Sequence, residues 1–323
     1  MLCRRFFLIA SALLVMATSQ QARAEVPVRI ATLPAGTVAW EVDTIIHNGF
    51  DKKHGIALAL VPVGGKQSAD VMLAGGATDV IVSDWIWVSR QRNAGADYAF
   101  IPYSRQVGSI VVKGDSAIKS LADLKGKKIG IAGGPTDKSW VLFQGLARHE
   151  LNLDLAKQAE PVFAAPPLLN EKLESGEIDA VITFWHFAAK LRAAGGRDIA
   201  TVTDAAQALG LDAETPLLGY VYSEKWSNEH ESAALKLAAA SADAKALLAT
   251  SEDEWRRLRP LMKVKTDAEF EALKAGFRAG IPKHMKVDEA AAASLFALLG
   301  KIGGAELVGD KPELAKGTFA SVE

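Results

Sequence analysis

The sequence predicts an α/β fold of two lobes, each built around a doubly wound mixed sheet. The first observation is that short β-rich runs alternate with segments of helical periodicity, from residue 28 and again from residue 128. The second is that extended stretches near 103–109 and 217–222 interrupt this alternation. The third is an alanine-rich, helix-favouring region after Glu229. Two repeats with two extended crossings predict two lobes joined by two hinge strands, with a helical C-terminal region.

The first repeat contains three predicted strands. Residues 28–33, 56–63 and 80–84 are rich in valine, isoleucine and leucine, and each run is followed by a loop with glycine, proline or serine and then by a helical pattern. In the helix after the first strand, Val42, Ile45, Ile46 and Phe50 recur at helical spacing. Strands that alternate with helices in this way predict a largely parallel sheet.

The second repeat begins with "KIGIAGG" at residues 128–134, which predicts a strand that ends in a glycine loop before a helix. A short helix over 121–124 precedes it, and a further stretch of strands and helices spans 160–195. We therefore expect a signal peptide at 1–24, lobe I at 25–104 plus 218–323 with the C-terminal helices, and lobe II at 105–217.

The chain begins with the features of a secretory signal peptide. Arg4 and Arg5 form a basic start, residues 6–17 are apolar, and residues 22–24 form a small-residue cleavage signal. The apolar stretch is too short to span a bilayer, so we expect cleavage after Ala24 and a periplasmic protein that is not embedded in the membrane. The arginine pair fits Sec export and twin-arginine export equally well.

Composition narrows the classes of function. The one cysteine, Cys3, lies within the expected signal peptide, so the mature chain has no thiol for disulfides or nucleophilic catalysis. The formal net charge of −1 gives no reason to expect a nucleic-acid partner. The hydrolase motif G-x-S-x-G and the zinc motif H-E-x-x-H are absent. We expect a monomer that is not an enzyme and holds no metal and no cofactor.

Three stretches carry a resemblance to a known family. They are "SAIKSLADLKGKKIGIAGG", "KLESGEIDAVITFW" and "GYVYSEKWSNEHESAALKLAAA". These resemble the solute-binding proteins of ABC importers, in the nitrate/sulfonate/taurine and thiamine-precursor branch, and the similarity extends over nearly the whole mature chain. The resemblance implies a clamp with a ligand cleft between two lobes and an importer permease as partner. It does not identify the ligand.

Tryptophans gather beside the loops that follow the predicted strands, where ligands bind in such sheets. Five of the seven lie there: Trp40, Trp85, Trp87, Trp140 and Trp185. A single tryptophan is more often a packing residue than a ligand contact. Five together predict an aromatic-lined cleft, because indole faces stack on planar ligands.

Cationic side chains in the same loops indicate an anionic ligand. Lys66 and Lys138 follow predicted strands, and helix starts near 35–38 and 136–139 offer backbone N–H groups. Arg105 lies in the first crossing, where it could clamp a carboxylate. Asp84 and Asp137 fit the role of helix N-caps. The full set of expected ligand-binding residues is Trp40, Lys66, Gln67, Asp84, Trp85, Arg105, Gly134, Thr136, Lys138, Trp140, Trp185 and His186.

The loop "GGPTDKSW" is predicted to bind a ligand rather than a nucleotide. It lacks the spacing of the phosphate-binding P-loop and of the dinucleotide motif G-x-G-x-x-G. We expect a protein that captures a planar aromatic anion, with pyrroloquinoline quinone as first candidate, by closure of its lobes and delivers it to an importer. Aliphatic or aromatic sulfonates and thiamine-type pyrimidines are alternative ligands. The alternatives from other classes are an enzyme of the pyrimidine-synthase type and an accessory protein that docks on a periplasmic dehydrogenase.

Overall fold

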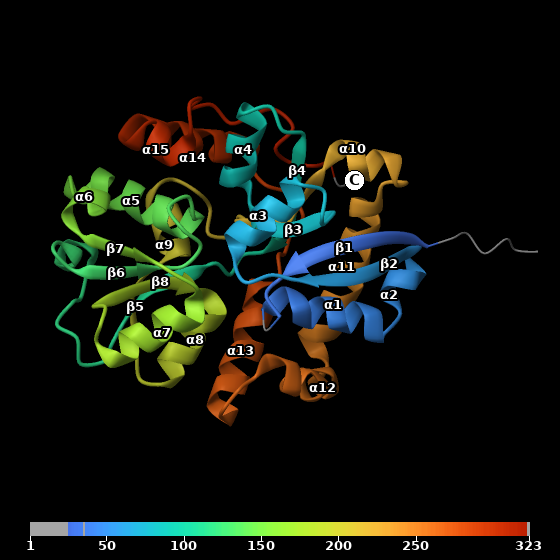
Figure 1. The fold of residues 1–323 in the computed structure, drawn as a ribbon, viewed down its shortest axis with the longest axis horizontal. Coiled ribbons are helices and arrows are strands. Elements are labelled where there is room, and N and C mark those ends of the chain that lie inside the picture. The colour runs from blue at the N-terminus through green and yellow to red at the C-terminus, as the bar shows by residue number, and fades with distance from the viewer. Residues whose placement is uncertain (1–24, 35, 322–323) are drawn as a thin grey trace, which may run out of the picture.

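The computed structural model describes residues 25–34 and 36–321. It contains two lobes side by side, each built on a five-stranded mixed sheet, with helices from the C-terminal region packed against both (Figure 1). This confirms the expected fold class, an α/β two-lobed fold of the periplasmic-binding-protein type. The expected signal peptide and its cleavage position lie outside the described residues.

Lobe I contains the first sheet, with strand order β2-β1-β3-β10-β4. β1 pairs in parallel with β2 and β3, whereas β10 runs antiparallel between β3 and β4. The strands are β1 (Val26–Thr32), β2 (Ile56–Pro62), β3 (Val80–Asp84), β4 (Tyr98–Ser104) and β10 (Leu218–Ser223). The helices between them are α1 (Thr37–His47), α2 (Phe50–Lys53), α3 (Lys66–Ala74) and α4 (Trp85–Asn93).

Lobe II repeats this arrangement with strand order β7-β6-β8-β5-β9. β6 pairs in parallel with β7 and β8, and β5 runs antiparallel between β8 and β9. The strands are β5 (Gly108–Val112), β6 (Lys128–Ile131), β7 (Glu160–Phe163), β8 (Ala180–Phe184) and β9 (Arg197–Thr201). Its helices are η1 (Leu121–Leu124), α5 (Lys138–Leu151), α6 (Leu155–Gln158), α7 (Pro166–Ser175), α8 (Trp185–Ala193) and α9 (Val202–Ala208).

Two crossings join the lobes at the stretches where the alternation of strands and helices in the sequence is interrupted. Residues 105–107 link β4 to β5, and residues 209–217 link α9 to β10. The extended stretch around 103–112 is therefore two strands in two different sheets, with a short turn between them. The first crossing leads into β5, the antiparallel strand of the lobe II sheet. The second leads into β10, the antiparallel strand of the lobe I sheet.

The C-terminal helices contact both lobes. They are α10 (Glu224–Glu229), α11 (Ala233–Thr250), α12 (Glu252–Met262), α13 (Asp267–Gly280), α14 (Glu289–Gly303) and α15 (Ala305–Val308). α11 packs on α1 of lobe I, whereas α13 packs on α8 and α14 on α5, which are both in lobe II (Figure 1). The expected domain boundary, which groups all of these helices with lobe I, stays a prediction.

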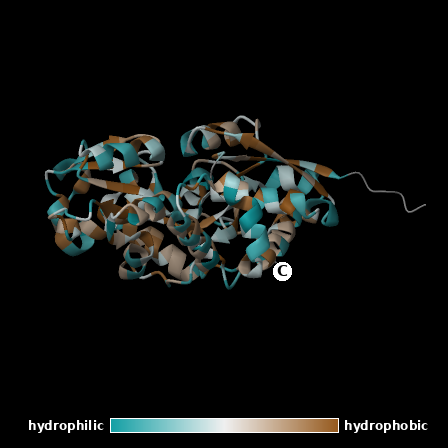
Figure 2. Ribbon diagram, turned by 90° about the horizontal axis from the view of Figure 1, so that it is seen from below, coloured by the Kyte–Doolittle hydropathy of each residue, from teal (hydrophilic) through white to brown (hydrophobic). Residues whose placement is uncertain are grey.

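Apolar strands form the interior of both lobes. Ile30 of β1 and Ile81 of β3 are fully buried in lobe I, as Ile110 of β5 and Ile129 of β6 are in lobe II. Figure 2 shows the corresponding strands coloured mainly as hydrophobic, with hydrophilic residues on the surrounding helices. Within the described ranges, no helix is both long and apolar enough to cross a membrane.

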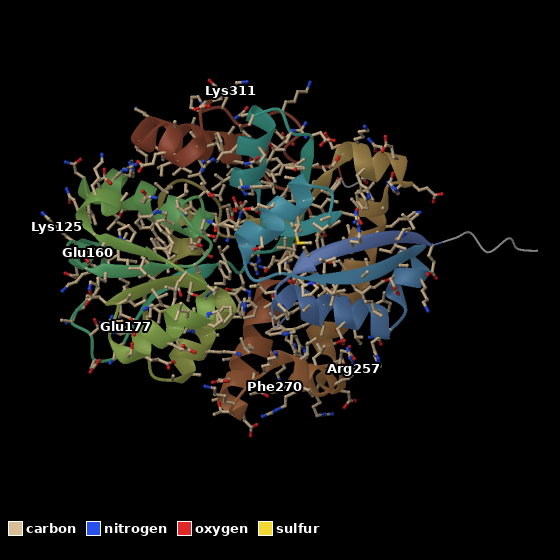
Figure 3. The ribbon with its side chains drawn as sticks, in the orientation of Figure 1. Lys125, Glu160, Glu177, Arg257, Phe270 and Lys311 are labelled. Carbon is tan, nitrogen blue, oxygen red and sulfur yellow. The ribbon has the colours of Figure 1, made fainter. Side chains whose placement is uncertain are left out.

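An ion pair at the surface fixes α12 to lobe I. Arg257 of α12 lies 2.5 Å from Oδ1 of Asp43 in α1 and 2.7 Å from Oε1 of Glu254 in its own helix. Figure 3 shows Arg257 on α12 and Phe270 on the neighbouring α13, both on the side of the molecule away from α14. The pair to Asp43 adds to the packing of α12 on α1.

Candidate functional site

A cavity lies between the lobes, and we call it the interlobe cavity. It encloses about 740 Å³ of space between atoms when its open mouth is included. The carboxyl ends of β1, β2 and β3 form one wall, and the first residues of α5 and α8 form the other. Its lining consists of Ala31, Thr32, Leu33, Gly36, Thr37, Val38, Val63, Gly65, Lys66, Ala69, Val82, Ser83, Tyr103, Val107, Lys138, Phe184, Trp185, His186 and Leu218.

Three helices begin at this cavity without a side-chain cap. Their N-cap residues are Gly36 for α1, Gly65 for α3 and Phe184 for α8, and all three line the cavity. None of the three makes a side-chain capping hydrogen bond in the described structure. The first N–H groups of an uncapped helix need an acceptor, and the positive end of the helix dipole favours an anion. Two of these N–H groups already have acceptors, because Ala39 N–H of α1 donates to the Gly36 carbonyl and Trp185 N–H of α8 to the Val107 carbonyl, each at 3.0 Å. The other first-turn N–H groups of α1, α3 and α8 are the backbone donors that the two lobes can offer at the cavity.

Two neighbouring helices are capped instead. Asp84 accepts a hydrogen bond of 2.8 Å from the backbone N–H of Trp87 at the start of α4. Asp137 accepts one of 2.9 Å from the backbone N–H of Ser139 at the start of α5. Both N-cap roles agree with the sequence-based interpretation. Asp84 was also among the expected ligand contacts, but it lies behind the cavity lining and is 1% exposed.

One lysine from each lobe reaches the cavity. Lys66 Nζ lies 2.9 Å from Oδ2 of Asp70, so its charge has a close partner. Lys138 is buried, and its Nζ lies 3.5 Å from Oδ2 of Asp137 and 5.5 Å from the centre of the Phe184 ring. Lys138 is thus the more weakly compensated ammonium and the better candidate to pair with an anionic ligand.

Burial also raises the pKa of two carboxyl groups beside these lysines. The pKa of Asp84 is raised because burial disfavours its charged form, against the opposing attraction of Lys66 and Lys138. The pKa of Asp70 is raised for the same first reason, with Lys66 again opposing. The field of the two lysines therefore reaches both carboxylates, which lie just outside the cavity.

His186 reaches the cavity from the second position of α8. Its ring is 6% exposed, and neither Nδ1 nor Nε2 has a hydrogen-bond partner among the described residues. Burial, followed by the nearby charge of Lys190, lowers its pKa to about 3. His186 is therefore a neutral imidazole at pH 7.

Trp185, the first residue of α8, is fixed from the C-terminal region. A Cβ added to Gly276 of α13 would collide with the Trp185 indole, so only glycine permits this close approach. Trp40 meets the same indole edge-on, with ring centroids 6.4 Å apart. α13 thereby helps to hold the start of α8, with Trp185 and His186, at the cavity.

A buried polar network lies behind the cavity on the side of lobe I. Glu41 accepts hydrogen bonds of 2.6 Å from the Tyr220 hydroxyl and from the Ser241 hydroxyl, and both of its oxygens lie 2.8 Å from Lys245 Nζ. Burial lowers the pKa of Lys245, while Glu41 raises it. Lys245 Nζ also lies 4.3 Å from the centre of the Tyr103 ring, which lines the cavity. The network braces the lobe I wall.

The structure brings four of the expected ligand-binding residues to the cavity lining. They are Lys66, Lys138, Trp185 and His186. Gln67 and Gly134 lie against each other at the contact between the lobes, where a Cβ on Gly134 would collide with the Gln67 amide. Thr136 is exposed just before α5. These three do not line the cavity.

The other expected tryptophans are core residues. Trp40 is fully buried between Trp185 and Trp255, and Trp85 is fully buried against Phe319. Trp140 is 3% exposed within the main hydrophobic core. Each lies near the end of a strand, as expected, but its ring turns into the lobe. Of the described tryptophans, Trp185 is the one in the cavity lining.

Arg105 makes its hydrogen bonds outside the cavity. Its guanidinium donates a hydrogen bond of 2.7 Å to Glu214 and one of 2.8 Å to the carbonyl of Ala279. Its backbone N–H donates to the carbonyl of Gly280. Arg105 therefore connects the two crossings and α13 instead of lying in the cavity lining, where the expected carboxylate clamp would place it.

Several lining residues were not among those expected. Ser83 and Phe184 are the penultimate residue of β3 and the last residue of β8, so the positions of the strand ends alone could have identified them. Tyr103 and Leu218 lie on β4 and β10, and no local signal in the sequence shows that these strands border the cavity. Thr37 begins α1, directly after an uncapped glycine.

Comparison with known sequence families places this chain in one of them. The family described as NMT1/THI5 like matches residues 46–254, well over half of the sequence. The chain belongs to the NMT1/THI5-like family. No curated protein sequence matches it significantly. This membership agrees with the resemblance described from the sequence motifs.

Solved structures share the fold of this NMT1/THI5-like protein at low sequence identity. A protein of Bordetella bronchiseptica RB50 has 19% identity and a TM-score of 0.71, with 88% of this chain and 94% of that chain covered. The alkanesulfonate-binding protein SsuA of Xanthomonas axonopodis pv. citri, bound to MOPS, has 18% identity and a TM-score of 0.69, with 92% and 99% covered. The periplasmic aliphatic sulphonate binding protein SsuA of Escherichia coli has 18% identity and a TM-score of 0.69, with 92% and 98% covered.

The same fold also occurs in an enzyme. The desulfurization enzyme DszB has 16% identity with the NMT1/THI5-like chain and a TM-score of 0.57, and the match covers 90% of this chain and 95% of that one. The fold alone therefore does not separate binding from catalysis. The residues that line the interlobe cavity have to distinguish a binding protein from an enzyme.

Proposed function

We propose that this protein is the solute-binding component of an ABC importer and that it captures a small organic anion in the interlobe cavity. The observation that carries the proposal is that the uncapped starts of α1, α3 and α8 all meet in one cavity. Backbone N–H groups at helix starts bind anions without needing a charged side chain. Buried Lys138 adds a positive charge beside them.

The walls of the cavity support an organic anion with a compact apolar body. Val63 and Val82 line it from lobe I, and Val107, Phe184 and Trp185 line it from the crossing and lobe II. Such walls gain free energy when they cover an apolar group, and bare inorganic ions offer none. A sulfonate or carboxylate on a short apolar skeleton fits both features. The names of the two SsuA structures are consistent with this class of ligand.

Pyrroloquinoline quinone, the first candidate from the sequence, remains one of the ligands to be tested. Its ring could stack on Trp185, and its carboxylates could meet the helix starts. The stacking platform is smaller than the sequence indicated, because Trp40, Trp85 and Trp140 are packed in the core. The thiamine-type pyrimidine is tested beside it.

Closure of the lobes would couple binding to transport. The cavity lining comes from both lobes, so a ligand that contacts both stabilises their closed arrangement, and a permease can recognise that arrangement. Residues 105–107 and 209–217 are the connections that would bend. We place the mature protein in the periplasm as a monomer, after cleavage of its signal peptide at Ala24, and we propose no catalytic role.

Isothermal titration calorimetry of the mature protein tests the proposal. The ligands are ethanesulfonate, an aromatic sulfonate, taurine, nitrate, pyrroloquinoline quinone and a thiamine-type pyrimidine. We expect saturable binding of at least one organic anion, weakened about tenfold or more in Lys138→Gln because a buried charge partner is removed. Lys157→Gln is the matched control, since Lys157 is 78% exposed on α6. A folded protein that binds none of the organic anions, or only the pyrimidine, contradicts the proposal, as does equal binding by the Lys138→Gln and Lys157→Gln variants.

A further inference from the structure

We propose that the ligand carries, besides its anionic group, a neutral hydrogen-bond donor such as a hydroxyl or amide N–H, and that His186 accepts this hydrogen bond. The inference rests on the proposed function and narrows the class of ligand within it. His186 is then the residue that selects hydroxylated or amide-bearing anions over anions that offer acceptors only.

The cavity lining contains buried polar atoms that lack partners. Within the described part of the chain these are the Ser83 hydroxyl and both ring nitrogens of His186, whereas the Tyr103 hydroxyl interacts with Thr37. They come from both lobes. Buried polar atoms in proteins are nearly always hydrogen-bonded, so a cluster of unpartnered ones around one cavity marks where a bound molecule supplies the missing bonds.

The described protein groups around His186 make no hydrogen bond to its ring nitrogens, so a partner has to come from the cavity. The imidazole lies 4.4 Å from the Phe187 ring, 5.7 Å from the Trp185 ring and 6.3 Å from the Phe184 ring, measured between centroids. Trp40 packs on it at 6.4 Å, and its own indole N–H lacks a partner. The phenyl rings offer no hydrogen-bonding atom, and the indole N–H groups are donors that make no hydrogen bond to either ring nitrogen of His186.

The protonation state of His186 decides what the ligand must offer. Burial keeps the imidazole neutral, because its pKa is lowered to about 3. A neutral imidazole has one N–H donor and one nitrogen acceptor. An acceptor-only anion can satisfy the donor, but it leaves the basic nitrogen without a partner. Before a ligand binds, water can fill that role, and a ligand that displaces this water has to replace its hydrogen bond.

The neighbouring charges favour a neutral donor over an ammonium group. Lys190 lies one helical turn after His186 and acts on it electrostatically, and Lys138 reaches the same cavity from α5. A ligand ammonium beside His186 would be repelled by both lysines. A hydroxyl or amide N–H donates the same hydrogen bond without this repulsion.

Matched pairs of anions that differ by one hydroxyl test the inference by calorimetry. The pairs are ethanesulfonate with 2-hydroxyethanesulfonate, propionate with 3-hydroxypropionate, and benzenesulfonate with 4-hydroxybenzenesulfonate. For at least one pair we expect the hydroxylated member to bind the wild type about fivefold or more tightly, since an unsatisfied buried acceptor carries a penalty of that size. In His186→Phe the preference should fall to less than about twofold, because the imidazole acceptor is absent. His149→Asn, on the exposed end of α5, should keep the wild-type preference.

The failure of this inference is distinguishable from failure of the proposed function. Binding of both members of every bound pair with equal affinity overturns the role of His186 and leaves anion binding intact. A preference that survives in His186→Phe also overturns it. Absence of binding by every anion overturns the proposed function and this inference together. Should His186→Phe not fold, ¹⁵N spectra of the wild-type imidazoles decide: the hydroxylated anion must shift the unprotonated ring nitrogen of His186, and the unsubstituted anion must not.

Discussion

Gln67 of α3 and Gly134 of the loop before α5 touch across the two lobes. Gly134 has φ +87°, and a Cβ at this position would collide with Nε2 of Gln67. The two residues were expected as ligand contacts, yet they meet each other beside the cavity. Because they belong to different lobes, this contact exists only while the lobes are together, which makes it a probe of closure.

Gly134→Ala should weaken ligand binding. The strain of a positive φ is the same whether the lobes are open or closed, but in the closed arrangement the methyl group also forces the Gln67 amide to move. We expect a penalty on closure of up to about 1.4 kcal/mol, which would raise the Kd by up to about tenfold. Gly76→Ala is the control, because Gly76 has φ +69° and no neighbour within reach of a Cβ. Calorimetry of both variants should show lower affinity in Gly134→Ala alone. Adding Gln67→Ala should recover part of it. Equal affinities would show that this contact does not respond to closure.

Trp185 should report ligand binding by fluorescence. It is the described tryptophan in the cavity lining, whereas Trp255 is fully buried and donates its indole N–H to the carbonyl of Leu248. We expect a bound anion to change the intrinsic emission of the wild type, and this change to be largely lost in Trp185→Phe. Trp255→Phe should retain it. A response that disappears only in Trp255→Phe would mean that binding is sensed through the core.

His186 should make the protein less stable as the pH falls. Its pKa is about 3 in the folded state against an ordinary value of 6.5, so between these values the unfolded chain binds a proton that the folded chain does not. The free energy of unfolding therefore falls with decreasing pH, by up to about 1.4 kcal/mol per pH unit from this group. Urea unfolding from pH 7 to 4 measures the slope. His186→Phe should show a shallower slope, and an unchanged slope would contradict the depressed pKa.

Lys245→Met should destabilise lobe I strongly. The substitution leaves Glu41 buried without its cation, at a cost of about 3–5 kcal/mol. Chemical denaturation measures the loss. The double variant Glu41→Gln with Lys245→Met should regain part of it, because the unpaired charge is removed as well.

Lys236→Met on the same helix is the control for Lys245→Met. Its partner Glu231 is 40% exposed, so its ion pair should contribute less than about 1 kcal/mol. Similar losses in the two single variants would show that the network of Glu41 and Lys245 has no special role in stability.

The sequence alone could predict the fold and the position of the cavity, because both depend on local patterns. Strand ends such as Ser83 and Phe184 follow from the alternation of β-rich runs and helices, and loops after parallel strands meet at one edge of a sheet. The chemistry of Lys138 and His186 at helix starts could be predicted on the same basis. This is why the two expected lysines and the expected histidine line the cavity, whereas Arg105 does not.

The direction of each tryptophan could not be predicted. Trp40 and Trp85 stand near helix starts, but the side that their rings face depends on partners such as Trp255 and Phe319, which come from the C-terminal region. The role of Arg105 depends on Glu214, more than a hundred residues later in the chain. Hydrophobic periodicity predicts which residues of a segment are buried, but it does not predict which distant residues they contact.

The insertion of β10 between β3 and β4 has a consequence for how the chain acquires its structure during synthesis. All strands of the second sheet lie between residues 108 and 201, so that sheet can form as soon as this stretch has left the ribosome. The first sheet has to wait, because β3 and β4 are joined only through a strand made after the whole of the second sheet. Its β1–β3 portion meanwhile exposes an unpaired edge at β3, which is where aggregation or chaperone binding would act on a nascent chain.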